Sequence, residues 1–191
     1  MSKKLFGIVG PSGSGKSTYV AYAREKTGFG EIISTTTRLP RKGEIDGKDY
    51  HFVTQEEFKN IEMIEIDEYA SNFYGTAQKD LDYAYLQSDC AFMVVTYEGA
   101  QIFKKLFKEK NLDIDVITIF VHTPIEELEK RMINRGDDKK RIKERIENIK
   151  QRKEYDNLHK TDYVFETSSD LTLEETCQQF TNFIYKISGE S

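Results

Sequence analysis

The stretch from Leu5 to Thr18, LFGIVGPSGSGKST, restricts the fold of this chain more than any other part of the sequence. It begins with a short apolar run of the kind that forms a buried parallel strand, and this run ends at Gly10. Gly15, Lys16 and Ser17 then complete the pattern G-x-x-x-x-G-K-[ST]. A helix-compatible segment follows directly, so the pattern has the preceding strand and the following helix that a phosphate-binding loop requires.

The loop between that strand and that helix is predicted to cradle phosphate groups. Gly10, Gly13 and Gly15 let the backbone curl with its N–H groups pointing inward, where they can donate to phosphate oxygens. Lys16 can reach the terminal phosphates, and the hydroxyl of Ser17 can bind Mg²⁺. The alternative is a Gly- and Ser-rich linker with a stray lysine, which the flanking strand and helix disfavour.

Composition limits the classes of protein to which the chain can belong. With 191 residues it suits one compact domain that carries mobile flaps, and it is too short for two large domains. The net charge of −5 argues against a general nucleic-acid binder, because such proteins are usually basic. No long apolar run occurs, so we expect neither a membrane span nor a signal peptide, and we expect a cytoplasmic location.

The cysteines and histidines do not suggest a redox or metal site. Cys90 and Cys177 are far apart and lack a C-x-x-C partner, so we interpret them as reduced core residues. The three histidines, His51, His122 and His159, are too scattered to form a metal site, and we expect structural roles for them.

Short apolar runs alternate with segments of helical periodicity along the chain. Strands are predicted at 31–35, 90–95, 116–121 and 163–165, and helices at 16–26, 79–87, 98–110 and 124–134. A closing helix is marked by an apolar stripe of Leu173, Cys177, Phe180, Ile184 and Ile187. This alternation predicts an α/β fold with a doubly wound parallel sheet, in which the phosphate cradle lies at the carboxyl end of the first strand.

Two segments depart from this alternation. Residues 36–47 are polar and rich in turn formers, and β-prone runs at 50–53 and 63–69 flank a predicted helix at 55–60, which indicates a small β-rich insert. Residues 139–153 are rich in Lys and Arg, as an RNA-binding helix would be. Glutamates are interleaved with these cations, so a solvated helix face is the favoured interpretation.

Four blocks of the sequence resemble the guanylate kinases. They are GPSGSGKST at 10–18, STTTRLPRKGEIDGKDYHFV at 34–53, EIDEYASNFYGT at 65–76 and RMINRG at 131–136, in the order and at the spacing of that family. The resemblance covers nearly the whole chain. It is much more specific than the phosphate loop alone, since P-loop proteins at large lack the block T-T-R-x-P-R-x-G-E-x-D-G-x-D-Y-x-F.

The resemblance implies a molecule of three parts. These are a P-loop NTPase-type body at about 1–33, 77–130 and 153–191, a small monophosphate-binding insert at about 34–76 and a helical lid at about 131–152. It also implies the reaction of ATP and GMP to ADP and GDP, with Mg²⁺ bound to ATP. ATP and GMP are then the partners, no nucleic acid or membrane is involved, and the protein is a monomer or a homodimer.

The same resemblance implies the residues of the site. Those expected to bind ATP are Gly10, Pro11, Ser12, Gly13, Ser14, Gly15, Lys16, Ser17 and Thr18, with Ser17 as the metal ligand. Those expected to bind GMP are Ser34, Arg38, Arg41, Tyr50, Glu65, Tyr74, Gly75, Thr76 and Thr96. The cations expected to act in catalysis are Lys16, Arg38, Arg41, Arg131, Arg135 and Arg145. Cations suit this role because phosphoryl transfer through a loose transition state needs positioning and positive charge more than covalent chemistry.

Glu65 is the residue predicted to select guanine. Guanine offers N1–H and N2–H₂ donors on one edge and a single carboxylate can accept from both, whereas adenine presents an acceptor at N1. The alternative is that Glu65 is a solvated strand carboxylate beside Asp67 and Glu68.

The chain departs from the family pattern where one predicted strand ends. The family usually has D-I-D-x-Q-G there, and this chain reads VVTYEG from Val94 to Gly99, so both acids are missing. In the family the first acid supports the Mg²⁺ shell through water, and the second helps to hold guanine and the insert. Thr167 also falls where many relatives have Asn near the adenine of ATP. The resemblance is therefore strong in phosphate handling and incomplete in metal support and base recognition.

Three functions remain open from the sequence. The first is a GMP kinase, and the second is a kinase of the same fold that acts on another phosphorylated acceptor. The third is a guanylate-kinase-like binding module without catalysis, like those of membrane-associated scaffolds. The intact Gly15, Lys16 and Ser17 argue against the module, because a peptide-binding domain has no use for a phosphate cradle.

Overall fold

The computed structural model describes residues 2–41, 43–69, 71–86, 88–134 and 136–189. The chain divides into two compact units, each assembled from two separate stretches of sequence. The first unit comprises Met1–Gly7 and Gly28–Val116, and the second comprises Ile8–Thr27 and Ile117–Ser191. Strand β1 (Lys3–Val9) contributes residues to both units.

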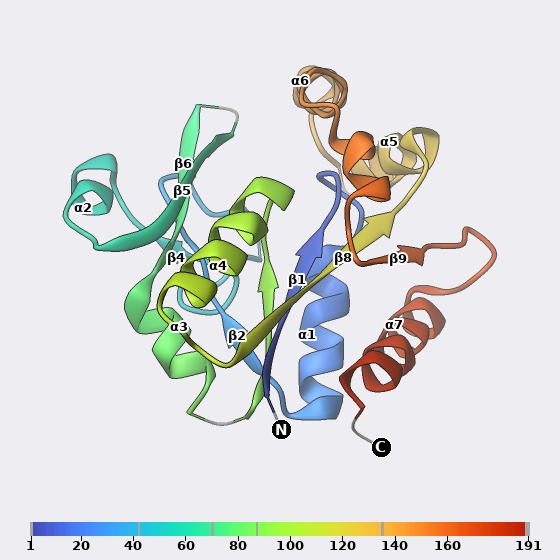
Figure 1. Ribbon diagram of the computed structural model, residues 1–191. Coiled ribbons are helices and arrows are strands. Elements are labelled where there is room, and N and C mark those ends of the chain that lie inside the picture. Colours follow the sequence, from blue (N-terminus) through green and yellow to red (C-terminus); the bar gives the residue numbers. More distant parts are fainter. Residues whose placement is uncertain (1, 42, 70, 87, 135, 190–191) are drawn as a thin grey trace. The chain divides into compact units, whose positions relative to one another are not determined.

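Five strands form a sheet with the order β2-β7-β1-β8-β9 (Figure 1). Strand β2 (Gly30–Ile32) runs parallel to β7 (Cys90–Val94), with Gly30 opposite Ala91. Strand β8 (Ile114–His122) runs parallel to β9 (Tyr163–Glu166), with Ile119 opposite Tyr163. Parallel neighbours that are not consecutive in sequence need crossover connections, which helices supply here. The predicted α/β fold with a parallel sheet is confirmed.

A hydrophobic core in the first unit joins strand β7 to helices α3 (Gln78–Ala84) and α4 (Tyr97–Glu109). Its buried members are Leu5, Ile32, Leu81, Ala84, Ala91, Met93, Phe103 and Phe107. The rings of Phe103 and Phe107 meet edge to face with their centroids 5.7 Å apart. Replacing a buried phenylalanine of this kind by alanine costs about 3–5 kcal/mol, so this core holds α4 firmly.

A second sheet, of four strands, lies within the first unit and has the order β4-β3-β6-β5. Its strands are β3 (Thr35–Thr36), β4 (His51–Phe52), β5 (Met63–Tyr69) and β6 (Asn72–Ala77). Helix α2 (Gln55–Lys59) connects β4 to β5 and begins with a capping box of Thr54 and Glu57. Strands β5 and β6 are antiparallel and place Glu65 opposite Thr76.

The segment 31–35 does not form the single strand that the sequence predicts. Instead β2 ends at Ile32 in the five-stranded sheet, and β3 begins at Thr35 in the four-stranded sheet. Both strands consist of β-prone residues, so the amino-acid composition does not indicate that the chain passes from one sheet to the other between them. Strand β6 was also not predicted, because Asn72 and Gly75 are poor strand formers and pairing with β5 overrides their preference.

In the second unit, helix α1 (Lys16–Thr27) lies beside the closing helix α7 (Leu173–Ser188) (Figure 1). Tyr19 of α1 is buried, and its ring centroid lies 6.1 Å from that of Phe165 and 5.8 Å from that of Phe180. Edge-to-face and tilted pairs of this kind add stabilisation beyond the area that they bury. The helix that follows the phosphate loop is therefore anchored by the last strand and the last helix of the chain.

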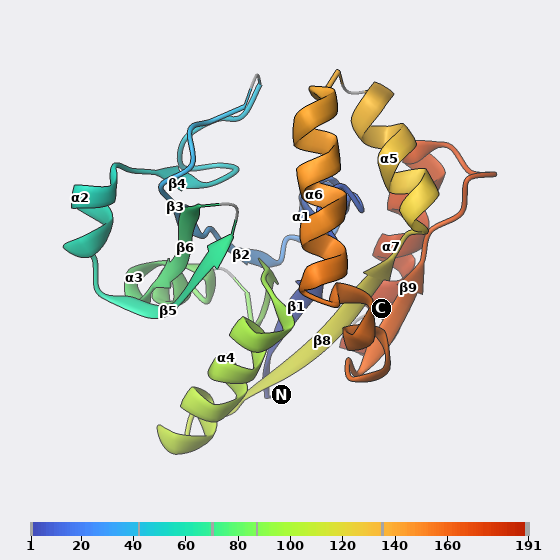
Figure 2. The ribbon, with the colours of Figure 1, turned by 90° about the horizontal axis from the view of Figure 1, so that it is seen from above.

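The segment predicted as a lid, 131–152, takes in the end of helix α5 (Ile125–Asn134) and all of helix α6 (Lys139–Gln151). The two helices lie side by side (Figure 2). Their buried contacts are made by Leu128, Met132, Ile142 and Ile149. Helix α6 begins at Asp138, whose carboxylate accepts from the backbone N–H groups of Lys140 and Arg141. A 3₁₀ turn at Glu154–His159 follows α6.

Other sequence expectations concern cysteines and membranes. Cys90 and Cys177 are buried and form no disulfide, which confirms the interpretation as reduced core residues. Among the helices of the described ranges, none combines the length and the apolar character that crossing a membrane requires.

Candidate nucleotide-binding sites

The phosphate loop joins the end of β1 to the start of α1 within the second unit. Gly10, Gly13 and Gly15 have φ values of +143°, +91° and +97°, a region that side chains other than glycine rarely adopt. A Cβ at Gly15 would lie 2.6 Å from the Tyr19 ring, and one at Gly10 would lie 2.7 Å from the carbonyl oxygen of Val121. Both conformation and space therefore require glycine at Gly10 and Gly15.

Lys16 folds back onto its own loop. Its Nζ donates to the carbonyl oxygens of Gly10, at 2.6 Å, and Pro11, at 2.8 Å. Burial lowers the pKa of Lys16 to about 8, and the nearby negative charge of Glu154 opposes this shift only in part. The ammonium group is thus a desolvated cation held mainly by neutral oxygens, a state that an anionic phosphate would relieve.

The middle of the loop carries an unsatisfied hydroxyl. Ser14 is fully buried, and its Oγ has no hydrogen-bond partner among the residues that the structure describes. An orphaned buried hydroxyl costs about 1–3 kcal/mol, and a phosphate oxygen at this place would satisfy it. Together with the glycine-only loop, this observation shows that the residues present fit a bound phosphate group.

Arg131 is brought to the same loop by helix α5. Its Nη1 lies 3.3 Å from the Ser14 carbonyl oxygen and 3.3 Å from the Tyr19 hydroxyl, and its Nε donates to Glu127 Oε1 at 3.2 Å. The structure therefore groups Arg131 with the predicted ATP-binding residues. Its role in catalysis stays a prediction.

Of the two other arginines predicted in the lid, the structure describes only Arg145. Arg145 of α6 is half-buried and pairs with Asp137, with 3.1 Å between its Nη1 and Oδ2 of that acid. Arg135 lies outside the described residues. Both remain predicted catalytic cations.

Ser12, Ser17 and Thr18 complete the predicted ATP-binding set. Ser17 and Thr18 are exposed in the first turn of α1, and Ser12 is half-buried in the loop. A serine hydroxyl is a hard oxygen ligand of the type that Mg²⁺ takes beside phosphate oxygens and waters. Within the described ranges, no group of three or more His, Cys, Asp or Glu side chains is arranged to hold a metal ion. The Ser17 hydroxyl thus fits a metal ion that also takes oxygens from the phosphates of a nucleotide.

A cavity of about 380 Å³ in the second unit is lined by Pro124, Glu126, Glu127, Lys130, Thr167, Ser168 and Ser169. Thr167 is the residue that stands where many relatives have Asn. Its Oγ1 lies 2.9 Å from that of Thr123 and donates to the carbonyl oxygen of His122 at 3.1 Å. The Thr167 hydroxyl is therefore engaged with the protein rather than held open for a base.

The residues predicted to bind the acceptor phosphate lie close together within the first unit. The Arg38 guanidinium carbon lies 5.3 Å from the centre of the Tyr50 ring, and the Tyr50 and Tyr74 rings meet edge to face at 5.9 Å. Burial, assisted by Tyr74, raises the pKa of Tyr50, so its hydroxyl stays protonated and able to donate. The guanidinium of Arg38 and the phenol rings of Tyr50 and Tyr74 come from separate segments and lie together here. A site for a phosphate dianion requires such a group of donors.

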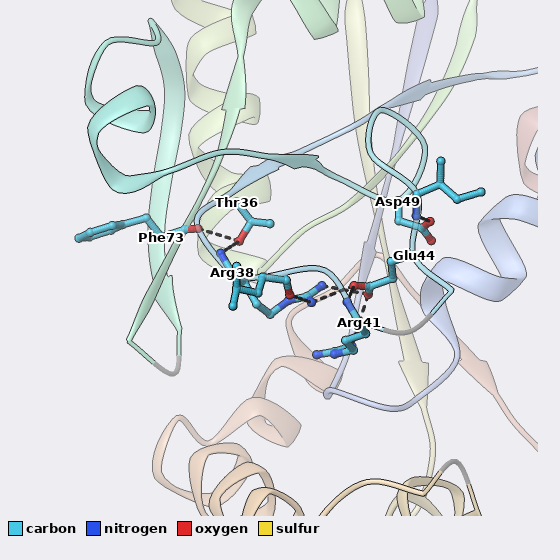
Figure 3. A network of polar contacts seen from close by, with 8 residues as sticks. Thr36, Arg38, Arg41, Glu44, Asp49 and Phe73 are labelled. Atoms are coloured by element: carbon cyan, nitrogen blue, oxygen red, sulfur yellow. Dashed lines mark hydrogen bonds and ion pairs between the residues drawn. The ribbon is translucent and has the colours of Figure 1, made fainter.

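Glu44 is a member of this site that the sequence analysis missed. Its carboxylate forms a bidentate pair with Arg38, with both N–O distances 2.9 Å, and accepts from the backbone N–H of Arg41 at 2.6 Å (Figure 3). Burial would raise the pKa of Glu44, but hydrogen bonds from Arg38 and Arg41 outweigh burial and lower it. The only signal for Glu44 is its place three residues after Arg41 in the block that carries the family resemblance.

The predicted base-binding residues also lie together. Glu65 is only 8% exposed, and its Oε1 accepts from the Thr76 hydroxyl at 2.9 Å. Burial raises the pKa of Glu65, and the hydrogen bond from Thr76 limits this rise. The alternative interpretation of Glu65 as a solvated carboxylate is wrong. Gly75 beside it is buried, and a Cβ there would lie 2.8 Å from the Glu65 carbonyl oxygen.

Thr96 lies at the start of α4, beside Glu65. Its hydroxyl caps the helix by accepting from the backbone N–H of Gly99 at 3.1 Å. A Cβ at Gly99 would lie 3.2 Å from Thr96 Oγ1 and 3.5 Å from Glu65 Oε2, so both oxygens border the same small space. Ser34 follows β2, and its carbonyl oxygen accepts from the backbone N–H of His51 at 2.9 Å.

A glycine-rich loop of this conformation, between a strand of a parallel sheet and the helix that follows, defines a P-loop phosphate-binding protein. The family model described as guanylate kinase matches residues 2–187. The chain belongs to the guanylate kinase family.

Individual relatives agree with this assignment. A guanylate kinase of Shewanella violacea is 38% identical over 145 residues, which cover 72% of this chain and 67% of that protein. A guanylate kinase of Synechococcus sp. is 34% identical over 191 residues, which cover 95% of this chain and 82% of that protein. The crystal structure of guanylate kinase from Anaplasma phagocytophilum matches with a TM-score of 0.68 at 27% identity, covering 97% of this chain and 86% of that chain.

Proposed function

We propose that this chain transfers the γ-phosphoryl group of ATP to GMP and so forms ADP and GDP. Family membership supports the reaction. The observation that carries it within the structure is the pairing of two sites on one insert, an arginine and tyrosine site for a phosphate and a buried carboxylate for a base. A nucleoside monophosphate is the ligand that presents both groups at once.

The chemistry needs no general base. The nucleophile is an oxygen of the acceptor phosphate, whose second pKa is about 6, so it is already largely ionised near neutral pH. What the transfer needs is alignment of two phosphates and positive charge around the transferring group. We assign Lys16, Arg131, Arg135 and Arg145 to the donor side and Arg38 and Arg41 to the acceptor side.

Mg²⁺ is the proposed cofactor, bound with ATP, and Ser17 is its proposed protein ligand. When bound, the metal neutralises charge on the donor phosphates. The side chain of Val94 offers no oxygen at the position where the family carries an acid that supports the metal shell through water. Loss of such outer support typically costs about 10–100-fold in metal affinity or activity, so we expect a high Mg²⁺ requirement.

Base selection is assigned to Glu65, Ser34, Thr76 and Thr96. The Thr76 hydroxyl occupies Oε1 of Glu65, and each carboxylate oxygen keeps lone pairs for the N1–H and N2–H₂ donors of guanine. Thr96 is neutral and already bonded to Gly99, so it adds little acceptor capacity. We therefore expect GMP to be the best acceptor, with a smaller preference over other bases than a guanylate kinase that carries both acids.

Conformational closure is part of the proposal. Direct transfer requires that the acceptor phosphate comes within reach of the γ-phosphate in the absence of water. We propose that the body at about 1–33, 77–130 and 153–191 carries two flaps, the insert at 34–76 and the lid at 131–152, which close when both nucleotides bind. Identical X-ray scattering profiles with and without a bisubstrate analogue would contradict this part.

The location and assembly of the protein remain predictions. We propose that it acts in the cytoplasm, as a monomer or a homodimer, with ATP and GMP as its partners. Neither a nucleic acid nor a membrane is expected among them.

The test is a coupled assay of ADP release with GMP, dGMP, AMP, CMP and UMP as acceptors. We expect the highest kcat/KM with GMP. A preferred acceptor without guanine would favour the second function, a kinase of the same fold for another substrate, and the neutral Thr96 is the feature that gives it weight. Absence of ADP release with all five acceptors would favour a binding module.

A further inference from the structure

Glu44 holds both arginines of the acceptor-phosphate site. Beyond the bidentate pair with Arg38 and the backbone N–H of Arg41, its Oε1 lies 3.8 Å from Nη1 of Arg41 (Figure 3). The side chains of Arg38 and Glu44 are only 13% and 16% exposed, so solvent screens this pair weakly. A carboxylate among phosphate-binding arginines either competes with the phosphate or fixes the arginines for it.

The hydrogen bonds of Arg38 distinguish these two roles. A guanidinium has five N–H donors in one plane. Nη1 uses both of its hydrogens, on Glu44 Oε2 at 2.9 Å and on the Leu39 carbonyl oxygen at 2.8 Å. Nη2 has one bond, to Glu44 Oε1 at 2.9 Å. Nε is buried and without a hydrogen-bond partner in the part of the chain that the structure describes.

Two donors of Arg38 therefore remain on one edge of the guanidinium. The N–H of Nε and the second N–H of Nη2 point the same way, which is the geometry that binds two oxygens of one phosphate. Glu44 occupies the adjacent edge, formed by Nη1 and Nη2, and leaves the second hydrogen of Nη2 unused. The hydrogen bonds between Glu44 and Arg38 therefore leave donors for the phosphate and do not indicate competition with it.

Other groups restrain Arg38 in the same orientation. The rings of Tyr50 and Phe52 lie 5.3 and 5.5 Å from its guanidinium carbon. Its backbone N–H donates to the Thr36 hydroxyl at 3.1 Å. With the backbone and the ring faces fixed, rotation about the last side-chain bonds remains, and the bidentate carboxylate removes that freedom.

We propose that Glu44 is a positioning residue that holds the Nη1 and Nη2 edge of Arg38 so that the adjacent edge, Nε and Nη2, is presented to the phosphate of the acceptor nucleotide. The inference rests on the proposed function, since it takes a nucleoside monophosphate as the acceptor. It also accounts for the buried Nε, because the acceptor phosphate supplies the missing partner. Glu44 stays ionised at neutral pH, since its pKa is lowered by the arginines.

The test replaces Glu44 by glutamine, which keeps the shape and removes the charge. We expect the Glu44→Gln variant to raise KM for GMP about 10–100-fold, with little change in kcat or in KM for ATP. Calorimetric affinity for GMP should fall by the same factor, while affinity for guanosine, which lacks the phosphate, should not change. The control is Glu62→Gln, at an exposed glutamate of the same insert, which should leave all of these values unchanged.

Further variants separate positioning from a structural role. Arg38→Lys keeps a charge but has no two-donor edge, so adding Glu44→Gln to it should have little further effect on KM for GMP. Additive effects would overturn the proposal. So would an unchanged KM for GMP, a lower KM, which indicates competition, or an equal loss of guanosine and GMP binding, which indicates collapse of the insert.

The role of Glu44 can still be tested if the Glu44→Gln variant does not fold or if the wild-type chain is inactive with GMP. If Glu44→Gln does not fold, Glu44→Asp keeps the charge on a shorter arm and should give an intermediate KM for GMP, whereas a wild-type KM overturns the proposal. If the wild-type chain shows no transfer to GMP, the proposed function fails, and the comparison of GMP with guanosine by calorimetry still decides the role of Glu44.

Discussion

The two proposed phosphate sites differ in how their positive charge is compensated. In the acceptor site, Arg38 is paired with Glu44, and this carboxylate outweighs burial and raises the pKa of the arginine. In the phosphate loop, Lys16 bonds to two neutral carbonyl oxygens, and burial lowers its pKa to about 8. We therefore expect the proposed acceptor site to be oriented, with the charge of Arg38 compensated, before its ligand binds. The loop holds a poorly compensated cation that gains its counter-charge from the ligand.

The largest effect is expected at the loop cation. Lys16→Ala should lower turnover by about 10³-fold or more, because Lys16 is the cation that the loop itself holds for the donor phosphates. The fold should survive, since Lys16 makes its bonds within the loop, and circular dichroism with thermal melting checks this. Lys186→Ala, at an exposed lysine of the same unit, is the control. Near-normal turnover of Lys16→Ala would exclude the loop as the site of transfer.

The next largest effect is expected at Glu65, which is proposed to bind the guanine base of the acceptor nucleotide. Glu65→Gln should lower kcat/KM for GMP about 10–100-fold and leave the rate with AMP nearly unchanged, because it removes an acceptor for two guanine donors. GMP affinity of the wild type should fall as pH falls through the raised pKa of Glu65, and the variant should lack this dependence. Glu68→Gln, at an exposed position of the same strand, should behave as wild type.

Restoring the two missing acids should give smaller changes, and these should improve the activity rather than impair it. Thr96→Asp should sharpen the preference for GMP about 10-fold, because aspartate still caps α4 and adds an acceptor beside Glu65. The new charge should also raise the pKa of Glu65 further. Thr96→Asn, which caps without charge, is the matched control. A wild type that already equals relatives carrying both acids would contradict this account.

Val94→Asp tests metal support separately. It should lower the Mg²⁺ concentration for half-maximal rate about 10-fold, since an acid there can orient metal-bound waters. Val94→Asn should have a weaker effect because it lacks the charge. If neither variant changes the metal requirement, the outer shell is completed by other groups.

The smallest expected effect is on stability. Lys16 has a pKa of about 8 in the folded protein and an ordinary value of 10.5. Between these pH values the unfolded chain binds more protons, so the free energy of unfolding should rise as pH rises through this window. Lys16→Met should remove that rise, as measured by urea unfolding at both ends of the window. Equal slopes for the two proteins would mean that Lys16 is solvated in the free loop.

The phosphate loop could be predicted because the residues that form it are close together in the sequence. Glycines at positive φ, a lysine and a hydroxyl at fixed spacing all lie within one short stretch, and so do the strand and helix around it. The partners of the loop were not predictable. Arg131 and Phe180 reach Ser14 and Tyr19 from far along the chain, and no pattern in the sequence specifies those contacts.

The acceptor site shows the same limit more clearly. Arg38, Tyr50, Glu65 and Tyr74 were identified only through the family resemblance, and no local pattern groups them. Glu44 was missed because its function is to hold another side chain, and an acid in a charged loop looks solvated in sequence. Strand β6 escaped prediction for a related reason, since its stability comes from β5 rather than from its own residues.

The packing of α1 on α7 has a consequence for the order in which the protein acquires activity during synthesis. A ribosome makes the phosphate loop well before it makes β9 and α7, which hold the aromatic partners of Tyr19. Until they emerge, the ring of Tyr19 lacks its aromatic cover, and the helix that follows the loop lacks its neighbour α7. Nascent chains that end before α7 should therefore expose this face to chaperones and fail to retain ATP, however complete their motif.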